Sequence, residues 1–108
     1  MNINTIDEKF ATTGQIRPAD VEHIRAMGFA GIVCARPDNE EAGQPSFADI
    51  AAAAERAGLK AFHIPVSDML GEGQIIRFEQ AMAEMAGPVL GYCRSGARAG
   101  SLYATLKS

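Results

Sequence analysis

Several features that mark common protein classes are missing from this 108-residue chain. Its two cysteines, Cys34 and Cys93, stand far apart and form neither a disulfide framework nor a Cys/His metal pattern, which favours a reducing compartment and no metal. No apolar run is long enough for a membrane span, and the N-terminus has no signal-peptide pattern. The net charge of −3 argues against nucleic-acid binding. We therefore expect a soluble, cytoplasmic protein that binds neither nucleic acid nor membrane.

Apolar segments and helical patterns alternate along the chain, whose length fits one domain spanning residues 1–108. The patterns predict strands at 10–13, 29–35, 59–66 and 88–92. They predict helices from Pro18 to Gly28, from Ser46 to Gly58, and at 74–85 and 97–106. This alternation is typical of an α/β fold with a mainly parallel sheet and helices on both faces.

Polar residues follow the ends of the predicted strands. In parallel sheets, ligands bind beyond the carboxyl ends of the strands, so these residues should share one rim. Besides the segment 93–98, the rim should contain the following side chains: Gln15, Arg36, Asp38 and Asp68. We expect the first three to help bind an anionic substrate.

The segment after the last predicted strand carries the strongest chemical signal. Cys93 ends the strand, and a glycine-containing loop, Arg98 and a helix follow. Backbone amides converge at such a junction and bind anions, while the helix dipole and nearby guanidinium groups lower the pKa of a thiol. We expect Cys93 to be the nucleophile and Arg98 to bind an oxyanion through two hydrogen bonds. The intervening residues should complete the anion site: Arg94, Ser95, Gly96 and Ala97.

The spacing between the cysteine and the arginine bears on the reaction. Four residues separate Cys93 from Arg98, as in rhodanese-type sulfurtransferases, whereas cysteine-dependent phosphatases have one residue more. Position 99, where a phosphatase would need arginine, is alanine. The shorter loop encloses a smaller bowl, which suits a persulfide sulfur better than a phosphoryl group.

Three functions remain open on this evidence. We first expect a sulfurtransferase that forms a persulfide on Cys93 from thiosulfate or a small persulfide. The alternative is a phosphatase that cleaves phosphate esters, with Cys93 as nucleophile, Arg98 as clamp and Asp68 as general acid. The third is a non-catalytic anion sensor. None of them requires a metal or an organic cofactor.

Motifs along nearly the whole chain resemble one protein family. They read GQ at 14–15, RPD at 36–38, QPSF at 44–47, HIPV at 63–66 and YCRSGAR at 92–98. With them the chain resembles the phosphatase-like domains of β-lactamase hydrolase-like proteins, which have also been described as sulfurtransferases. The resemblance implies a three-layer fold like that of dual-specificity and tyrosine phosphatases, with a loop of rhodanese length. Because some members are fused to persulfide dioxygenases of the metallo-β-lactamase fold, it also implies such a partner.

Overall fold

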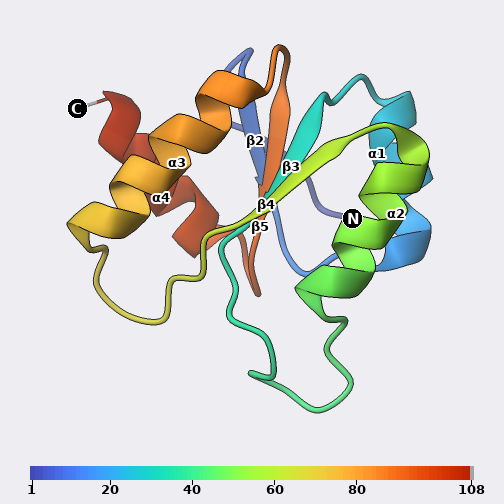
Figure 1. Ribbon diagram of the computed structural model, residues 1–108, viewed down its shortest axis with the longest axis horizontal. Coiled ribbons are helices and arrows are strands. Elements are labelled where there is room, and N and C mark those ends of the chain that lie inside the picture. Colours follow the sequence, from blue (N-terminus) through green and yellow to red (C-terminus); the bar gives the residue numbers. More distant parts are fainter. Residues whose placement is uncertain (108) are drawn as a thin grey trace.

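The computed structural model, which describes residues 1–107, places a five-stranded sheet between two layers of helices (Figure 1). The strands run in the order β1-β2-β5-β3-β4, and only β1 is antiparallel to its neighbour. Their bounds are β1 Asn4–Thr5, β2 Phe10–Thr13, β3 Gly31–Cys34, β4 Lys60–His63 and β5 Val89–Tyr92. The mainly parallel sheet that the alternating pattern predicted is therefore confirmed.

The helices cover both faces of this sheet. A short 3-10 turn (η1) leads into α1, which packs with α2 on one face, while α3 and α4 lie on the other (Figure 1). Their bounds are η1 Pro18–Asp20, α1 Val21–Ala26, α2 Phe47–Ala57, α3 Glu72–Glu84 and α4 Ala97–Lys107. No helix within residues 1–107 combines the length and the apolar character needed to cross a membrane.

Local signals explain where α2 begins and ends. The hydroxyl of Ser46 accepts a hydrogen bond from the Asp49 amide at 3.1 Å, which caps the helix as the sequence predicted. Gly58 follows the last turn with a φ of 80°, a left-handed conformation that glycine adopts at little cost. The carboxylate of Asp38 accepts a further hydrogen bond from the Phe47 amide at 2.8 Å. The start of α2 is thus tied to the loop that leaves β3.

The prediction and the structure differ at two strands, β4 and β1. The strand expected at 59–66 is shorter, since β4 ends at His63 just before the segment that contains Pro65. Hydrogen bonds to β3 nevertheless continue irregularly, from the Ile64 amide to Cys34 and from the Val66 amide to Ala35, each at 2.9 Å. The two-residue strand β1 was not predicted, because so short a segment has no periodic pattern.

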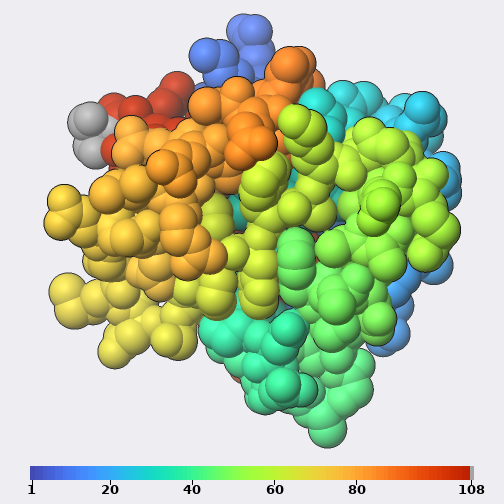
Figure 2. All heavy atoms as spheres, viewed as in Figure 1, coloured from blue at the N-terminus to red at the C-terminus, as the bar shows by residue number. Residues whose placement is uncertain are grey.

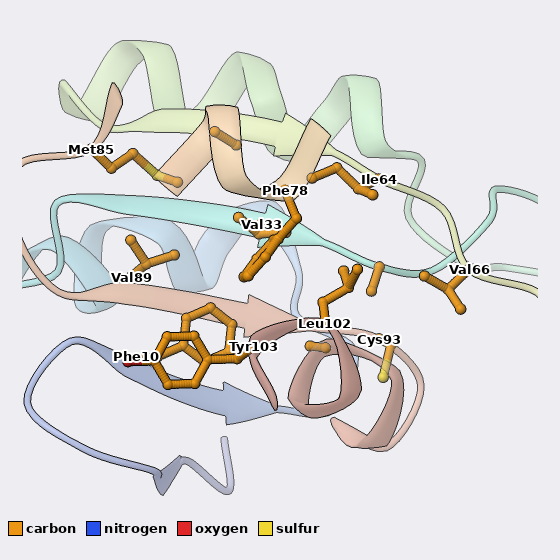
Figure 3. Close-up of a cluster of buried hydrophobic side chains, with 13 residues drawn as sticks. Phe10, Val33, Ile64, Val66, Phe78, Met85, Val89, Cys93, Leu102 and Tyr103 are labelled. Carbon is orange, nitrogen blue, oxygen red and sulfur yellow. The ribbon is translucent and has the colours of Figure 1, made fainter. Parts of the chain in front are cut away.

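One of the two core clusters lies between the sheet and the helices α3 and α4 (Figure 3). Phe10 stacks on Tyr103 with 4.5 Å between ring centroids, and Phe78 meets Phe10 edge-on at 5.8 Å. Cys93 belongs to the same cluster and lies at its edge, where β5 ends and α4 begins (Figure 3). The loop that follows Cys93 therefore starts from a residue that is packed in the core.

A polar clamp connects the first loop to the last helix. Asp7 accepts hydrogen bonds from the Tyr103 hydroxyl at 2.7 Å and from the backbone amides of Lys9 and Phe10. Lys107 lies 3.0 Å from the same carboxylate. The Tyr103 hydrogen bond, then the Lys9 amide and Lys107, hold the pKa of Asp7 well below its usual range. The ionised form of Asp7 is therefore part of the folded structure.

Candidate active site

The cysteine loop joins β5 to α4 at the carboxyl edge of the sheet. The Cys93 amide donates to the Thr13 carbonyl at 3.4 Å, which fixes the loop to the end of β2. Gly96 has a φ of 97°, and its amide donates a hydrogen bond to the Cys93 sulfur at 3.0 Å. The Ser95 hydroxyl accepts from the Ala97 amide at 3.3 Å, so it stabilises the start of the helix. The loop thus curls around the sulfur as the sequence predicted.

Backbone amides determine the ionisation of this thiol. Burial disfavours the thiolate, but the amides of Ala99, Ser95, Arg98 and Gly96 together outweigh burial and lower the pKa of Cys93. The opposite holds at Cys34, where burial raises the pKa of a thiol that contacts the Arg36 carbonyl at 3.4 Å. The two cysteines are both buried, yet the pKa is lowered at Cys93 and raised at Cys34, so Cys93 forms the thiolate more readily.

A close backbone contact supports the loop from below. A Cβ atom added to Gly14 would lie 2.8 Å from the Arg94 carbonyl oxygen, closer than real side chains come. Gly14 directly follows the end of β2, so only glycine lets this segment approach the cysteine loop so closely. Gly14 therefore has a steric role beside the loop that follows Cys93.

The guanidinium of Arg98 lies at the rim, where Glu40 and the Val66 carbonyl accept its hydrogen bonds and the Cys93 sulfur lies close by. Its Nη1 donates to Glu40 Oε2 and to the Val66 carbonyl, each at 2.8 Å, and its Nη2 donates to Glu40 Oε1 at 2.9 Å. Glu40 raises the pKa of Arg98, and the charge of the Cys93 sulfur acts in the same direction. The arginine that should clamp a substrate is thus already paired with a carboxylate.

Glu40 itself lies between two arginines. Arg36 donates through Nε to Glu40 at 2.8 Å, through Nη1 to Gln15 at 2.9 Å and through Nη2 to Glu41 at 2.7 Å. Arg98 and then Arg36 lower the pKa of Glu40 to about 2, so this carboxylate is charged at neutral pH. The network joins the ends of β2 and β3 to the cysteine loop. It confirms that Gln15, Arg36 and Arg98 share one rim.

A shallow hollow of about 390 Å³ opens over this network. It is lined by Arg36, Glu40, Glu41, Ser67, Arg94 and Arg98. The loop between β3 and α2, which carries both glutamates, projects beyond the sheet at this end of the molecule as the teal-to-green lobe (Figure 2). The side chain of Arg94 is 70% exposed and lies 3.6 Å from Glu41.

The other predicted site residues contribute less to this arrangement. Asp68 is exposed beside Ser67, and its carboxylate makes no hydrogen bond within residues 1–107. The carboxylate of Asp38 accepts a hydrogen bond at the start of α2. Within the described part of the chain, it makes no contact with the network around Arg36 and Arg98 that would support its predicted role in anion binding. Among the same residues, no group of three or more His, Cys, Asp or Glu side chains could hold a metal ion.

Sequence reasoning missed Glu40 and Glu41. Both lie in a polar loop, where acidic residues usually face solvent. The only available signal was their position four and five residues after Arg36, close behind a strand end on the predicted rim. That signal is weak, because the sequence does not show that the Arg98 guanidinium reaches Glu40 in the folded protein.

Comparison with known proteins identifies the family of this chain. The profile of the family described as beta-lactamase hydrolase-like protein, phosphatase-like domain, matches residues 2–108. A beta-lactamase hydrolase-like protein of Agrobacterium fabrum is 43% identical over 99 residues, which cover 91% of this chain and 23% of the relative. The chain thus spans less than a quarter of the length of this curated relative.

Solved structures give the same fold. A candidate phosphatase from Neisseria meningitidis superimposes with a TM-score of 0.86 and 37% identity, covering 99% of this chain and 77% of that one. The core catalytic domain of a PP-IP phosphatase from S. cerevisiae gives a TM-score of 0.73 at 14% identity, covering 99% and 65%. The predicted phosphatase-like fold is therefore confirmed. Because the family is described as phosphatase-like and the Neisseria protein is named a phosphatase, the comparisons favour the phosphatase alternative over our first expectation.

Proposed function

Since the chain belongs to the family of phosphatase-like domains of beta-lactamase hydrolase-like proteins, we propose that it is a cysteine-dependent phosphatase acting on small phosphate esters. One observation carries the proposal. The Cys93 thiol has a lowered pKa at the start of α4, under converging backbone amides and beside Arg98. A nucleophile, an oxyanion site and a guanidinium thus meet at one point.

The proposed reaction has two steps. The Cys93 thiolate attacks phosphorus, a sulfur–phosphorus bond forms, and the ester oxygen leaves with the bonding electrons and takes a proton from Asp68. Water then attacks the phosphocysteine and returns a proton to Asp68, releasing inorganic phosphate and the thiolate. The loop amides and Arg98 stabilise the charge on the phosphoryl oxygens in both steps. Asp68 is assigned as the acid because it adjoins Ser67, which lines the same hollow as Arg98.

Sulfur transfer is retained as a second candidate because of the short loop. Four residues separate Cys93 from Arg98, and sulfur transfer needs no acid. In that reaction the thiolate attacks the outer sulfur of thiosulfate, the sulfur–sulfur bond breaks, and sulfite leaves with its electron pair. A thiol acceptor then removes the sulfur. The partner proposed for this case is a persulfide dioxygenase of the metallo-β-lactamase fold.

One experiment separates the two reactions. Wild type, Cys93→Ser and Asp68→Asn are assayed on an aryl phosphate, and on thiosulfate with cyanide as acceptor, while mass spectrometry identifies the group carried by Cys93. For a phosphatase we expect a trapped phosphoryl group on Cys93 and a turnover reduced by about 100-fold or more in Asp68→Asn. Cys93→Ser should be inactive.

The contrary result is equally clear. A wild type that leaves the aryl phosphate intact, gains one sulfur on Cys93 and keeps its sulfur transfer in Asp68→Asn would replace the phosphatase with the sulfurtransferase. An intact, folded protein that binds phosphate but turns over neither substrate would indicate an anion sensor.

A further inference from the structure

The hydrogen bonds of Arg98 to oxygen acceptors leave one edge of its guanidinium open toward the Cys93 sulfur. Glu40 and the Val66 carbonyl accept from Nη1, and Glu40 also accepts from Nη2. Within residues 1–107, the Nε–H group and the second hydrogen of Nη2 have no oxygen acceptor. These two donors lie side by side and form the other edge that can bind an oxyanion through two hydrogen bonds. Glu40 therefore occupies Arg98 without using up its capacity to bind an anion.

Arg36 is the fixed point of the network. Its side chain is only 2% exposed, and each of its three nitrogens has a partner in Gln15, Glu40 or Glu41. Its carbonyl oxygen also lies 2.8 Å from the His63 ring, which stacks on Phe47. An arginine so enclosed cannot turn toward a substrate without breaking several contacts. It can, however, hold the Glu40 carboxylate in place.

We propose that Arg36 and Glu40 are positioning residues of the reaction. The buried Arg36 fixes Glu40, and Glu40 fixes the terminal edge of Arg98, so that the Nε–Nη2 edge is presented to the anion over Cys93. The inference rests on the proposed function in that this anion is the phosphoryl group. It replaces our sequence-based prediction that Gln15 and Arg36 bind the substrate directly.

The charges of the network agree with this role. Glu40 stays ionised at neutral pH, since Arg98 and Arg36 lower its pKa to about 2, so it remains a good bidentate acceptor throughout the working range. The Cys93 sulfur acts on the pKa of Arg98 in addition to Glu40, as expected for a guanidinium close to the thiol. The side chain of Arg98, in the first turn of α4, is thus restrained by a carboxylate from the loop between β3 and α2.

The test needs a readout that does not depend on turnover. We would measure how inorganic phosphate protects Cys93 from iodoacetamide, together with aryl phosphate hydrolysis, in wild type, Glu40→Gln, Arg36→Lys and the double variant. Glutamine keeps the shape of Glu40 but offers only one acceptor, so Glu40→Gln should weaken phosphate protection by about 10- to 100-fold. Lysine cannot hold Glu40 and its neighbours at once, so Arg36→Lys should act in the same direction.

Two comparisons distinguish positioning from general damage. If Arg36 acts through Glu40, adding Arg36→Lys to Glu40→Gln should cause no further loss. Glu79→Gln is the matched control, because Glu79 is an exposed carboxylate on α3 that has no hydrogen bond or ion pair with Arg36, Glu40 or Arg98 within residues 1–107. It should weaken protection by less than about threefold. Circular dichroism and thermal unfolding check that each variant folds. If Arg36→Lys does not fold, phosphate protection in Glu40→Asp and Glu40→Gln decides whether the Glu40 carboxylate positions Arg98.

Several results would overturn the proposal. Tighter phosphate binding in Glu40→Gln would make Glu40 a competitor of the substrate, and additive losses in the double variant would make Arg36 independent of Glu40. Absence of protection in wild type would mean that Arg98 holds no phosphate. Protection that depends on Glu40, in a wild type without phosphatase turnover, would uphold the positioning role and reject only the proposed function.

Discussion

Replacing Gly14 with alanine tests whether the cysteine loop depends on the close approach of two backbone segments. The new Cβ would lie 2.8 Å from the Arg94 carbonyl oxygen, whereas ordinary contacts begin at 3.4 Å, so the segments must separate by about 0.6 Å. The nearest atoms all belong to the backbone, and no side chain can rotate away to make room. The loop itself must therefore move.

The size of the effect follows from this shift. Overpacking of this kind costs about 1–3 kcal/mol, partly offset by a gain of about 0.4–1 kcal/mol from the less flexible unfolded chain. A movement of this size in the loop that holds the nucleophile should lower kcat/KM by about 10- to 100-fold. It should also disturb the amide contacts to the sulfur, so the pKa of Cys93 should rise toward that of an ordinary thiol.

The assay compares Gly14→Ala with Gly73→Ala in thermal unfolding, aryl phosphate turnover and the pH dependence of Cys93 alkylation. Gly73 lies in the first turn of α3, and a Cβ there would meet nothing within 4 Å, so alanine should be neutral or stabilising by up to about 1 kcal/mol. If Gly14→Ala keeps the wild-type alkylation profile and melting temperature, the close contact does not control the loop, and the reasoning is wrong.

Three further predictions concern single side chains. Cys93 should react with iodoacetamide below the pH typical of a thiol while Cys34 stays unmodified, because the pKa is lowered in one and raised in the other; peptide mass spectrometry that finds Cys34 alkylated first would refute this. Arg98→Lys should reduce turnover far more than Arg94→Lys, since the planar guanidinium beside the thiol belongs to Arg98. Equal losses in two folded variants would show that the substrate clamp was assigned to the wrong arginine. Asp7→Asn should lower the free energy of unfolding at neutral pH, but the difference from wild type should shrink below about pH 4, because there the unfolded chain takes up a proton at Asp7 while the folded protein, in which the pKa of Asp7 is depressed, does not. Urea denaturation at both pH values measures this difference, and a constant difference would contradict the assigned cause.

Local patterns in the sequence were sufficient for the architecture. The alternation of strand and helix, the cap at Ser46 and the stop at Gly58 depend on residues near one another in the chain, and the structure has them as predicted. The placement of Cys93 between a strand and a helix was also predictable from neighbouring residues, because it depends only on where one strand ends and the next helix begins. The strand β1 escaped because two residues are too short to carry a period.

The choice of reaction was harder to determine from the chain alone. The distance between Cys93 and Arg98 along the sequence favoured sulfur transfer, but it describes one loop, whereas the similarity to phosphatases extends over nearly all of the chain. Loop length is a local quantity. The reaction also depends on which groups from other loops surround the thiol, and the spacing does not describe them.

The sequence by itself determined the layers, the order of the elements and the position of Cys93 between a strand and a helix, because periodicity, caps and a strand-to-helix junction act over a few residues. Only the tertiary structure decided the partners of Arg98. Glu40 is 58 residues away from Arg98 in the chain and reads as an ordinary loop carboxylate. Its role arises only when the parallel strands bring their carboxyl ends together, so that the buried Arg36 holds it at the mouth of the cysteine loop. Such a contact depends on chain topology, which no local pattern encodes.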